Sequence, residues 1–97
     1  MNLTKTTTLK TDVLGTAAAV TRSKAIKEAQ RHARHRFTAA VAEIHNVSIF
    51  SLKGSGIIRM IEVVHNNVHA DEDGLFYCTS TCIFSATIIT RVTALEN

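Results

Sequence analysis

The stretch TRSKAIKEAQRHARHRFTAAVAEI, residues 21–44, decides the fold of this chain. Its apolar residues recur every three or four positions, which is the period of one face of an α-helix. The stretch therefore predicts one amphipathic helix with an alanine-rich stripe that can approach a sheet closely. Thr21 or Ser23 is expected to cap its first turn, and the helix is expected to end near His45 and Asn46. The stripe consists of Ile26, Ala29, Ala33, Phe37, Val41 and Ile44.

The segments on both sides of this helix predict β-strands. TDVLGTAAAV, residues 11–20, lacks helical charge spacing and suits a strand in which Gly15 permits a close approach or a bulge. After the helix, VSIFSL (residues 47–52) alternates like a strand, and residues 53–56, Lys-Gly-Ser-Gly, predict a turn. IIRMIEVVH, residues 57–65, is rich in β-branched side chains and predicts the next strand.

A polar loop from Asn66 to Gly74 is expected to reverse the chain into a last strand, Leu75–Ile89. That strand alternates strictly, which indicates an antiparallel sheet with one covered and one wetter face. Cys78 and Cys82 share a face but are about 13 Å apart along a strand, too far for a disulfide or for one metal ion. They are expected to be buried free thiols. One face carries Phe76, Cys78, Ser80, Cys82, Phe84, Ala86 and Ile88, and the other Tyr77, Thr79, Thr81, Ser85 and Thr87.

Together these segments predict an α+β fold of the β-α-β-β type, with one amphipathic helix packed on a three- to four-stranded antiparallel sheet. The 97 residues are expected to form a single domain, 1–97, in which residues 1–10 are either disordered or an edge strand. The chain has no Trp and only 5% aromatic residues. Its core must therefore be small, and a homo-oligomer would bury more apolar surface.

Positive charge is concentrated on the predicted helix. Residues 22–36 hold six Lys or Arg against one acid, Glu28, whereas the whole chain has a net charge of +3. A simple solvated surface explains this pattern, and so does a site for an acidic protein, an anionic surface or nucleic acid. Aromatic residues for base stacking are few, and no known nucleic-acid-binding motif accompanies the charge. The candidate partner-binding or anion-binding residues are Lys24, Lys27, Arg31, Arg34 and His35.

Other chemistries find little support in the sequence. His32 and His35 have a metal-binding spacing, but the flanking arginines oppose a cation. His65 and His69 stand near Asp71, Glu72 and Asp73, which could form a His/carboxylate site but are equally explained by a polar turn. There is no nucleophile with a base and no phosphate-binding glycine loop. We therefore expect no enzyme activity, no catalytic residue, no metal and no cofactor.

The compartment is open at this point. No apolar run approaches the roughly 18 residues that would cross a bilayer, and residues 1–12 are Thr-rich where an export signal would be apolar. The cytoplasm is the default expectation. The periplasm or cell envelope is the alternative if an export signal has been removed.

The order of motifs resembles the small β-α-β-β domain of bacterial envelope and flagellar-assembly proteins, the family of the flagellar T protein N-terminal domain and related surface-lipoprotein domains. The matching positions span roughly residues 13–86, although the helix here is more basic. This resemblance implies a structural, non-catalytic assembly module. The matches are Gly15 and Ala17 in the first strand, Gly56 with Ile57 or Ile58 in the next, and Gly74, Tyr77 and Thr79 at the last.

The outline, with SKAIKEAQRHA and a long final hairpin, is also similar to dodecin, a hollow oligomer that binds flavins. Trp is absent, so the aromatic stacking expected for a flavin is not provided. The sequence thus predicts a non-catalytic, oligomeric interaction or assembly module. Two alternatives remain: binding of nucleic acid or an acidic partner through the basic helix face, and carriage of a small ligand in a pocket at a helix–sheet or subunit interface.

Overall fold

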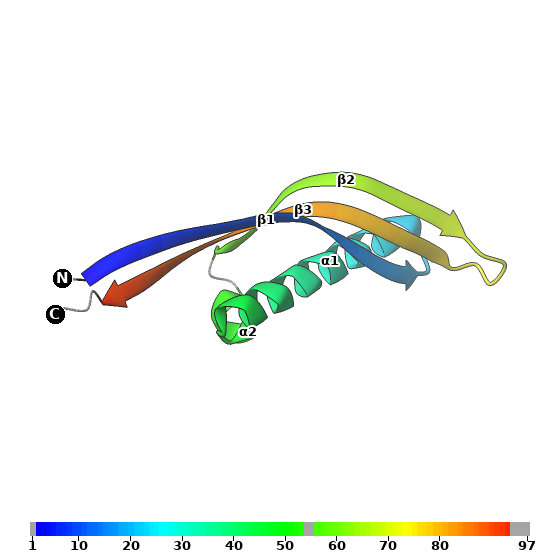
Figure 1. Cartoon of the computed structure of the whole chain (residues 1–97). Helices are drawn as coiled ribbons and strands as arrows, with labels where there is room; N and C mark the ends of the chain where they lie inside the picture. The colour runs from blue at the N-terminus through cyan, green and yellow to red at the C-terminus, as the bar shows by residue number, and fades with distance from the viewer. Residues whose placement is uncertain (1, 54–55, 94–97) are drawn as a thin grey trace.

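The computed structural model describes residues 2–53 and 56–93 as three strands and two helices (Figure 1). The strand β3 lies in the centre of the sheet, antiparallel to β1 on one side and β2 on the other. The long helix α1 covers one face. This arrangement confirms the predicted α+β fold with one helix on an antiparallel sheet, here of three strands. In chain order the elements are β1 (Asn2–Ala19), α1 (Arg22–His45), α2 (Ile49–Leu52), β2 (Ile58–Ala70) and β3 (Phe76–Thr93).

The strand β1 begins at Asn2, so the Thr-rich lead belongs to an edge strand, one of the two readings that the sequence left open. β1 pairs with β3 along its whole length, from Asn2 opposite Thr93 to Ala19 opposite Phe76. β2 pairs with β3 only between Phe76 and Ala86, and residues 87–93 of β3 pair with β1 alone. Beyond Ala86, β1 and β3 form a two-stranded ribbon, which makes the molecule 69 Å long but only 22 by 17 Å across (Figure 1).

The helix α1 has the predicted ends. The hydroxyl of Thr21 accepts the Lys24 N–H at 3.2 Å, and Asn46 closes the helix in the left-handed conformation, with φ of 53°. The buried stripe differs in part from the prediction. It consists of every fourth residue from Ala25 through Val41 together with Thr38 and Ala42, whereas Ile26 is only half-buried and Ile44 is 64% exposed. Ile44 comes three residues after Val41 instead of four, so its side chain lies beside the buried row and not in it.

The predicted strand at residues 47–52 is wrong, because Ile49–Leu52 form the short helix α2. Ser48 caps this turn by accepting the Phe50 N–H at 3.2 Å. Ile49 and Leu52 are three residues apart and both contact the core, while Phe50 is 84% exposed. The apolar spacing was therefore helical, and the hydroxyl before it was a cap. Gly54 and Ser55 of the predicted turn lie outside the described residues.

The predicted loop at Asn66–Gly74 is also wrong over its first half, because β2 continues to Ala70. Asn66 is accommodated in the strand since its side-chain Oδ1 accepts the hydroxyl proton of buried Ser80 at 2.6 Å. Val68 packs on the core. The turn itself occupies only residues 71–75, where Gly74 adopts a φ of 80° that favours glycine.

The core lies between α1 and the alternating face of β3, as predicted. Cys78, Ser80, Cys82, Phe84 and Ala86 are all buried there. Phe84 stacks on Phe37 of α1, with ring centroids 5.5 Å apart. Both cysteines are buried free thiols, which confirms that prediction. Burial raises the pKa of the Cys78 thiol, against the opposing effect of the Arg22 charge.

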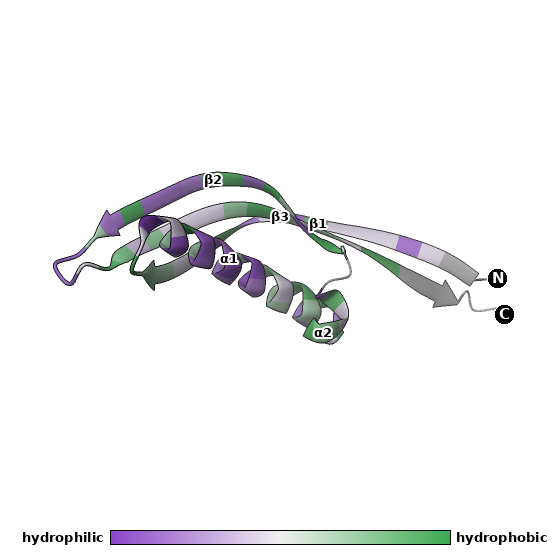
Figure 2. Ribbon diagram, turned by 180° about the vertical axis from the view of Figure 1, so that it is seen from behind, coloured by the Kyte–Doolittle hydropathy of each residue, from purple (hydrophilic) through white to green (hydrophobic). Residues whose placement is uncertain are grey.

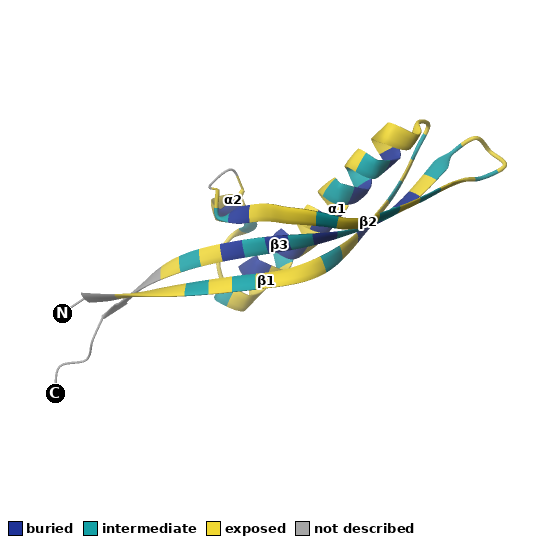
Figure 3. Ribbon diagram, turned by 90° about the horizontal axis from the view of Figure 1, so that it is seen from above, coloured by how far each residue is buried: buried dark blue, intermediate teal, exposed yellow. Residues whose placement is uncertain are grey.

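The opposite face of the sheet has no helix on it among the described residues (Figure 3). Exposed residues run along β1 and β2 on this side, which we call the open face. Among the residues directed to it are Leu14, Val64, Tyr77 and Ile89, all exposed. A sheet covered on one side only is common for antiparallel strands, but its wet face is usually polar.

Gly15 determines how closely α1 approaches the sheet. A Cβ atom at this position would lie 2.0 Å from the Ala29 carbonyl oxygen and 2.8 Å from the Ala33 Cβ. No relaxation of a flexible side chain could relieve the first contact, because it is made to backbone. Gly15 and the small residues of α1 therefore bring the helix backbone directly against β1, which confirms the predicted close approach.

The substitution Gly15→Ala is expected to lower the free energy of unfolding by about 3 kcal/mol, because the added methyl group forces the helix away from the strand. Urea unfolding followed by circular dichroism measures this change. Ala18→Ser, an exposed site on the same strand, serves as the control and should change stability by about 0.5 kcal/mol or less. Equal stability of the two variants would contradict the close-packing argument.

Candidate functional site

The five sequence-predicted site residues are all exposed and lie between residues 24 and 35 of α1, the part of the helix where hydrophilic residues gather (Figure 2). The structure brings some of them together. Arg31 and Arg34 line two neighbouring pockets, of which one also includes His35 and the other Lys27. Lys24 lines neither pocket. The basic surface is therefore two adjoining sites with two shared arginines, rather than a single uniform face.

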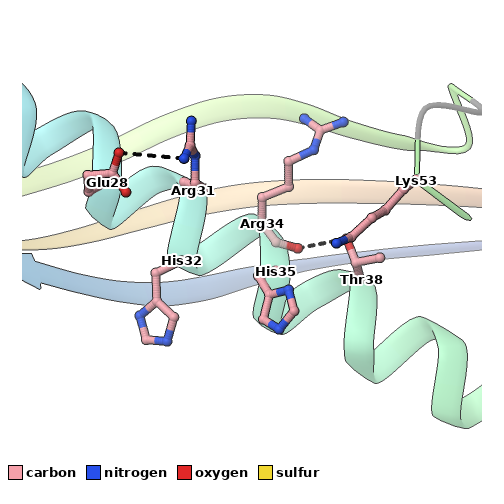
Figure 4. A pocket seen from close by; sticks show the side chains of 7 residues that line it. All are labelled: Glu28, Arg31, His32, Arg34, His35, Thr38 and Lys53. Carbon is pink, nitrogen blue, oxygen red and sulfur yellow. Dashed lines mark hydrogen bonds and ion pairs between the residues drawn. The ribbon is translucent and has the colours of Figure 1, made fainter. Parts of the chain in front are cut away.

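The larger pocket, of about 400 Å³, lies against α1 and is predominantly cationic. Arg31 and Arg34 extend from the helix toward β2, and Lys53 reaches in from beyond α2 (Figure 4). Its one carboxylate, Glu28, lies 3.7 Å from the Arg31 guanidinium, a long and exposed pair that neutralises little of this charge. The lining is completed by His32, His35 and the backbone-bonded Thr38.

Lys53 is the one cationic Lys or Arg of this pocket that the sequence pattern did not predict. It follows α2 directly and is brought beside α1 because the short helix turns the chain back. A strand at residues 47–52, as predicted from the sequence, would have carried Lys53 away from α1 instead of turning the chain back. The signal that could have found it was the spacing of Ile49 and Leu52 after Ser48, which indicates a capped helical turn.

The smaller pocket, of about 220 Å³, lies between α1 and β2. Its apolar surface is provided by Met60 and Phe84, and its basic rim by Lys27, Arg31 and Arg34. It exists because α1 packs mainly over β1 and β3 and leaves part of β2 uncovered. A carboxylate or phosphate with an attached apolar group matches this combination of surfaces.

Three basic side chains of α1 form hydrogen bonds with backbone groups of the sheet. Arg34 donates to the Ile58 carbonyl at 3.0 Å. On the free edge of β1, the Thr16 N–H donates to His32 Nδ1 at 3.0 Å, and Arg36 donates to the Leu14 carbonyl at 2.7 Å. These bonds cover part of an edge that would otherwise offer pairing groups to another strand. Part of the positive charge thus has a structural role.

The His65/His69/acid cluster considered from the sequence does not assemble as a metal site. His69 stacks on Tyr77, with ring centroids 5.6 Å apart, and Asp71 accepts the N–H groups of Asp73 and Leu75 within the turn. Desolvation opposes ionisation of Asp71, but hydrogen bonds from Tyr77 and these N–H groups lower its pKa overall. Within residues 2–53 and 56–93, no three His, Cys, Asp or Glu side chains form a metal-binding group.

No protein-family model, curated protein or solved structure matches this chain. The resemblances drawn from the sequence therefore stay predictions, and function has to be argued from geometry. Within the described part of the chain, no helix has the length and apolar character needed to span a membrane.

His32 and His35 provide a matched test of the structural role of the basic helix. His32→Ala removes the acceptor for the Thr16 N–H and is expected to lower the free energy of unfolding by about 1 kcal/mol. His35→Ala removes the same side chain one helical turn away from the β1 edge and should be nearly neutral. Chemical denaturation of both variants measures the difference. A larger loss for His35→Ala would contradict the assignment.

Proposed function

We propose that this protein is a non-catalytic module that assembles through association of its own copies. The observation that supports this proposal best is the open face of the sheet, which leaves Leu14, Val64 and Ile89 exposed at 45%, 53% and 68%. Apolar side chains on the same surface lose contact with water when another molecule covers them.

The shape of the chain supports the same proposal. A two-stranded ribbon without a third strand is marginally stable in water, and here it extends well beyond the part of the sheet that α1 and α2 cover (Figure 1). Packing against a second copy would stabilise the ribbon. The small alanine-rich core leads to the same expectation, since an interface adds to the buried apolar surface.

The expected result is a dimer or a larger assembly at micromolar concentration, measured by light scattering after size exclusion and by sedimentation velocity. Because the molecule is elongated, the elution volume alone would overestimate its mass, so the scattering mass decides. The protein is measured at roughly 50 μM, a high concentration for a cellular protein. A monomeric mass at this concentration would overturn the proposal.

A second function, binding of an acidic protein segment, is favoured by the cationic pocket on α1. Arg31 and Lys53 converge there with only Glu28 to oppose them. The pocket and the open face lie on opposite sides of the sheet, so both could be used at once. An extended acidic segment could follow α1 from this pocket toward Lys27, whereas few aromatic side chains are available to stack on bases.

Arg31→Ala and Lys53→Ala are each expected to weaken binding of a fluorescein-labelled glutamate peptide about fivefold, corresponding to about 1 kcal/mol for one exposed ionic contact. Fluorescence anisotropy at low salt measures the affinity, and added salt should weaken it. Lys5→Ala removes the same charge from the ribbon and should change little. The proposal would be overturned if Arg31→Ala and Lys53→Ala weakened peptide binding no more than Lys5→Ala does. It would also be overturned if the parent protein bound single-stranded DNA of equal charge more tightly than the glutamate peptide.

A further inference from the structure

The open face carries a charge pattern that the sequence does not display. Cross-strand partners share a face, so the open face can be described in rows across β1, β3 and β2. One row contains Lys10, Ser85 and Arg59, and the next contains Asp12, Ile83 and Glu62. A cationic row therefore lies directly beside an anionic row, about 7 Å from it.

An uncovered depression follows this boundary. A pocket of about 480 Å³ on the open face is bordered by Lys10, Asp12, Val64, Thr81 and Ile83. Its apolar floor and charged edges have the composition of an interface centre with a polar surround. β2 has register shifts after Met60 and after Val63, and Val64, the extra residue of the second shift, borders this pocket.

The charge boundary falls at the middle of β1 and β3 and near the start of β2. It passes over Phe84, which has eight residues of β3 before it (Phe76–Ile83) and nine after it (Ser85–Thr93). On β1 the corresponding position is Thr11, close to the middle of Asn2–Ala19. A two-fold axis at this boundary would consequently superimpose nearly the whole length of both strands on those of a second copy.

We propose that the open face binds a second copy of this chain, face to face, about a two-fold axis that runs across the strands above Phe84. This inference rests on the proposed self-association and adds its surface and symmetry. The rotation places Lys10 against Asp12 of the other copy and Arg59 against Glu62 of the other copy. Every contact occurs twice, as required of a self-complementary interface.

The charges select this axis over the other way of stacking two such sheets. An axis parallel to the strands would place β1 over β2 of the second copy and would bring Lys10 against Arg59 and Asp12 against Glu62. Like charges in direct opposition are destabilising. The axis across the strands converts each of these pairs into an attractive one.

The area of the face is adequate for a dimer. About this axis, β1 and β3 of the two copies overlap over about 17 rows and β2 over about 5 rows. At about 4.8 Å by 3.4 Å per residue this offers on the order of 600 Å² per copy, the lower end of the roughly 600 to 1,000 Å² per partner in a standard interface. The ribbon of each copy would lie over the hairpin end of the other. Two twisted sheets stack in this way at about −30°.

A charge exchange tests the register. Lys10→Asp alone places two carboxylates in opposition at two symmetric positions and should raise the dimer dissociation constant at least tenfold, as measured by sedimentation equilibrium. The double variant Lys10→Asp/Asp12→Lys restores opposite charges and should return the constant to within about threefold of the parent. Lys5→Asp makes the same change on the opposite face of β1 and should have no effect.

A distance measurement provides a second readout. A spin label at Thr79→Cys should report an inter-label distance of about 35 Å, from ten residues of offset along the strands and about 10 Å between the sheets. Cys78 and Cys82 are buried and should remain unlabelled. A well-defined distance that differs by more than 10 Å would overturn the proposed axis.

The outcomes separate this inference from the proposed function. A monomeric parent protein would overturn both. A dimer whose stability responds equally to Lys10→Asp and Lys5→Asp, or is not restored by the double exchange, would overturn the face and axis while leaving self-association intact.

Discussion

The contact of Gly15 with the backbone of α1 is the constraint on which the other features depend. Because a Cβ at this position would meet the Ala29 carbonyl oxygen at 2.0 Å, the helix can lie this close only to a strand that has glycine here. The contact holds α1 over β1 and β3. His32 and Arg36 consequently reach the edge of β1, and a gap over β2 becomes the smaller pocket. Close packing at one point thus positions groups far from it.

The fold was largely predictable because its strongest signals are local. Helix period, the caps at Thr21 and Asn46, and the alternation of β3 all depend on residues near one another in the chain. The errors arose where tertiary contacts decided between two patterns. Asn66 reads as loop until Ser80 is placed opposite it, and Ile49 with Leu52 reads as strand until the core requires both on one side.

The sequence predicted which basic residues lie on the surface of α1. It did not predict which of them are free to bind a ligand and which are bonded to the sheet. The helical period places Arg31, Arg34 and His35 outside the core, but it does not indicate that Arg34 bonds to the Ile58 carbonyl or that Lys53 enters the same pocket. The bond from Arg34 to Ile58 joins residues 24 apart in sequence, and Lys53 likewise comes from a different segment than α1. The charged rows of the open face were equally hidden, because they become rows only through the register of β1, β3 and β2.

The strand order β1-β3-β2 has a consequence for how the chain acquires its structure. β1 pairs only with β3, so that the β1 ladder cannot begin before the start of β3 has been synthesised, and its pair of Asn2 with Thr93 waits for the end of β3. During translation α1 and the β2–β3 hairpin can form from neighbouring residues, while β1 stays without a sheet partner. Such distant pairing slows folding. The three-stranded sheet is therefore completed only after β3 has left the ribosome, and the Thr-rich first half of β1 keeps that waiting strand free of a long apolar run.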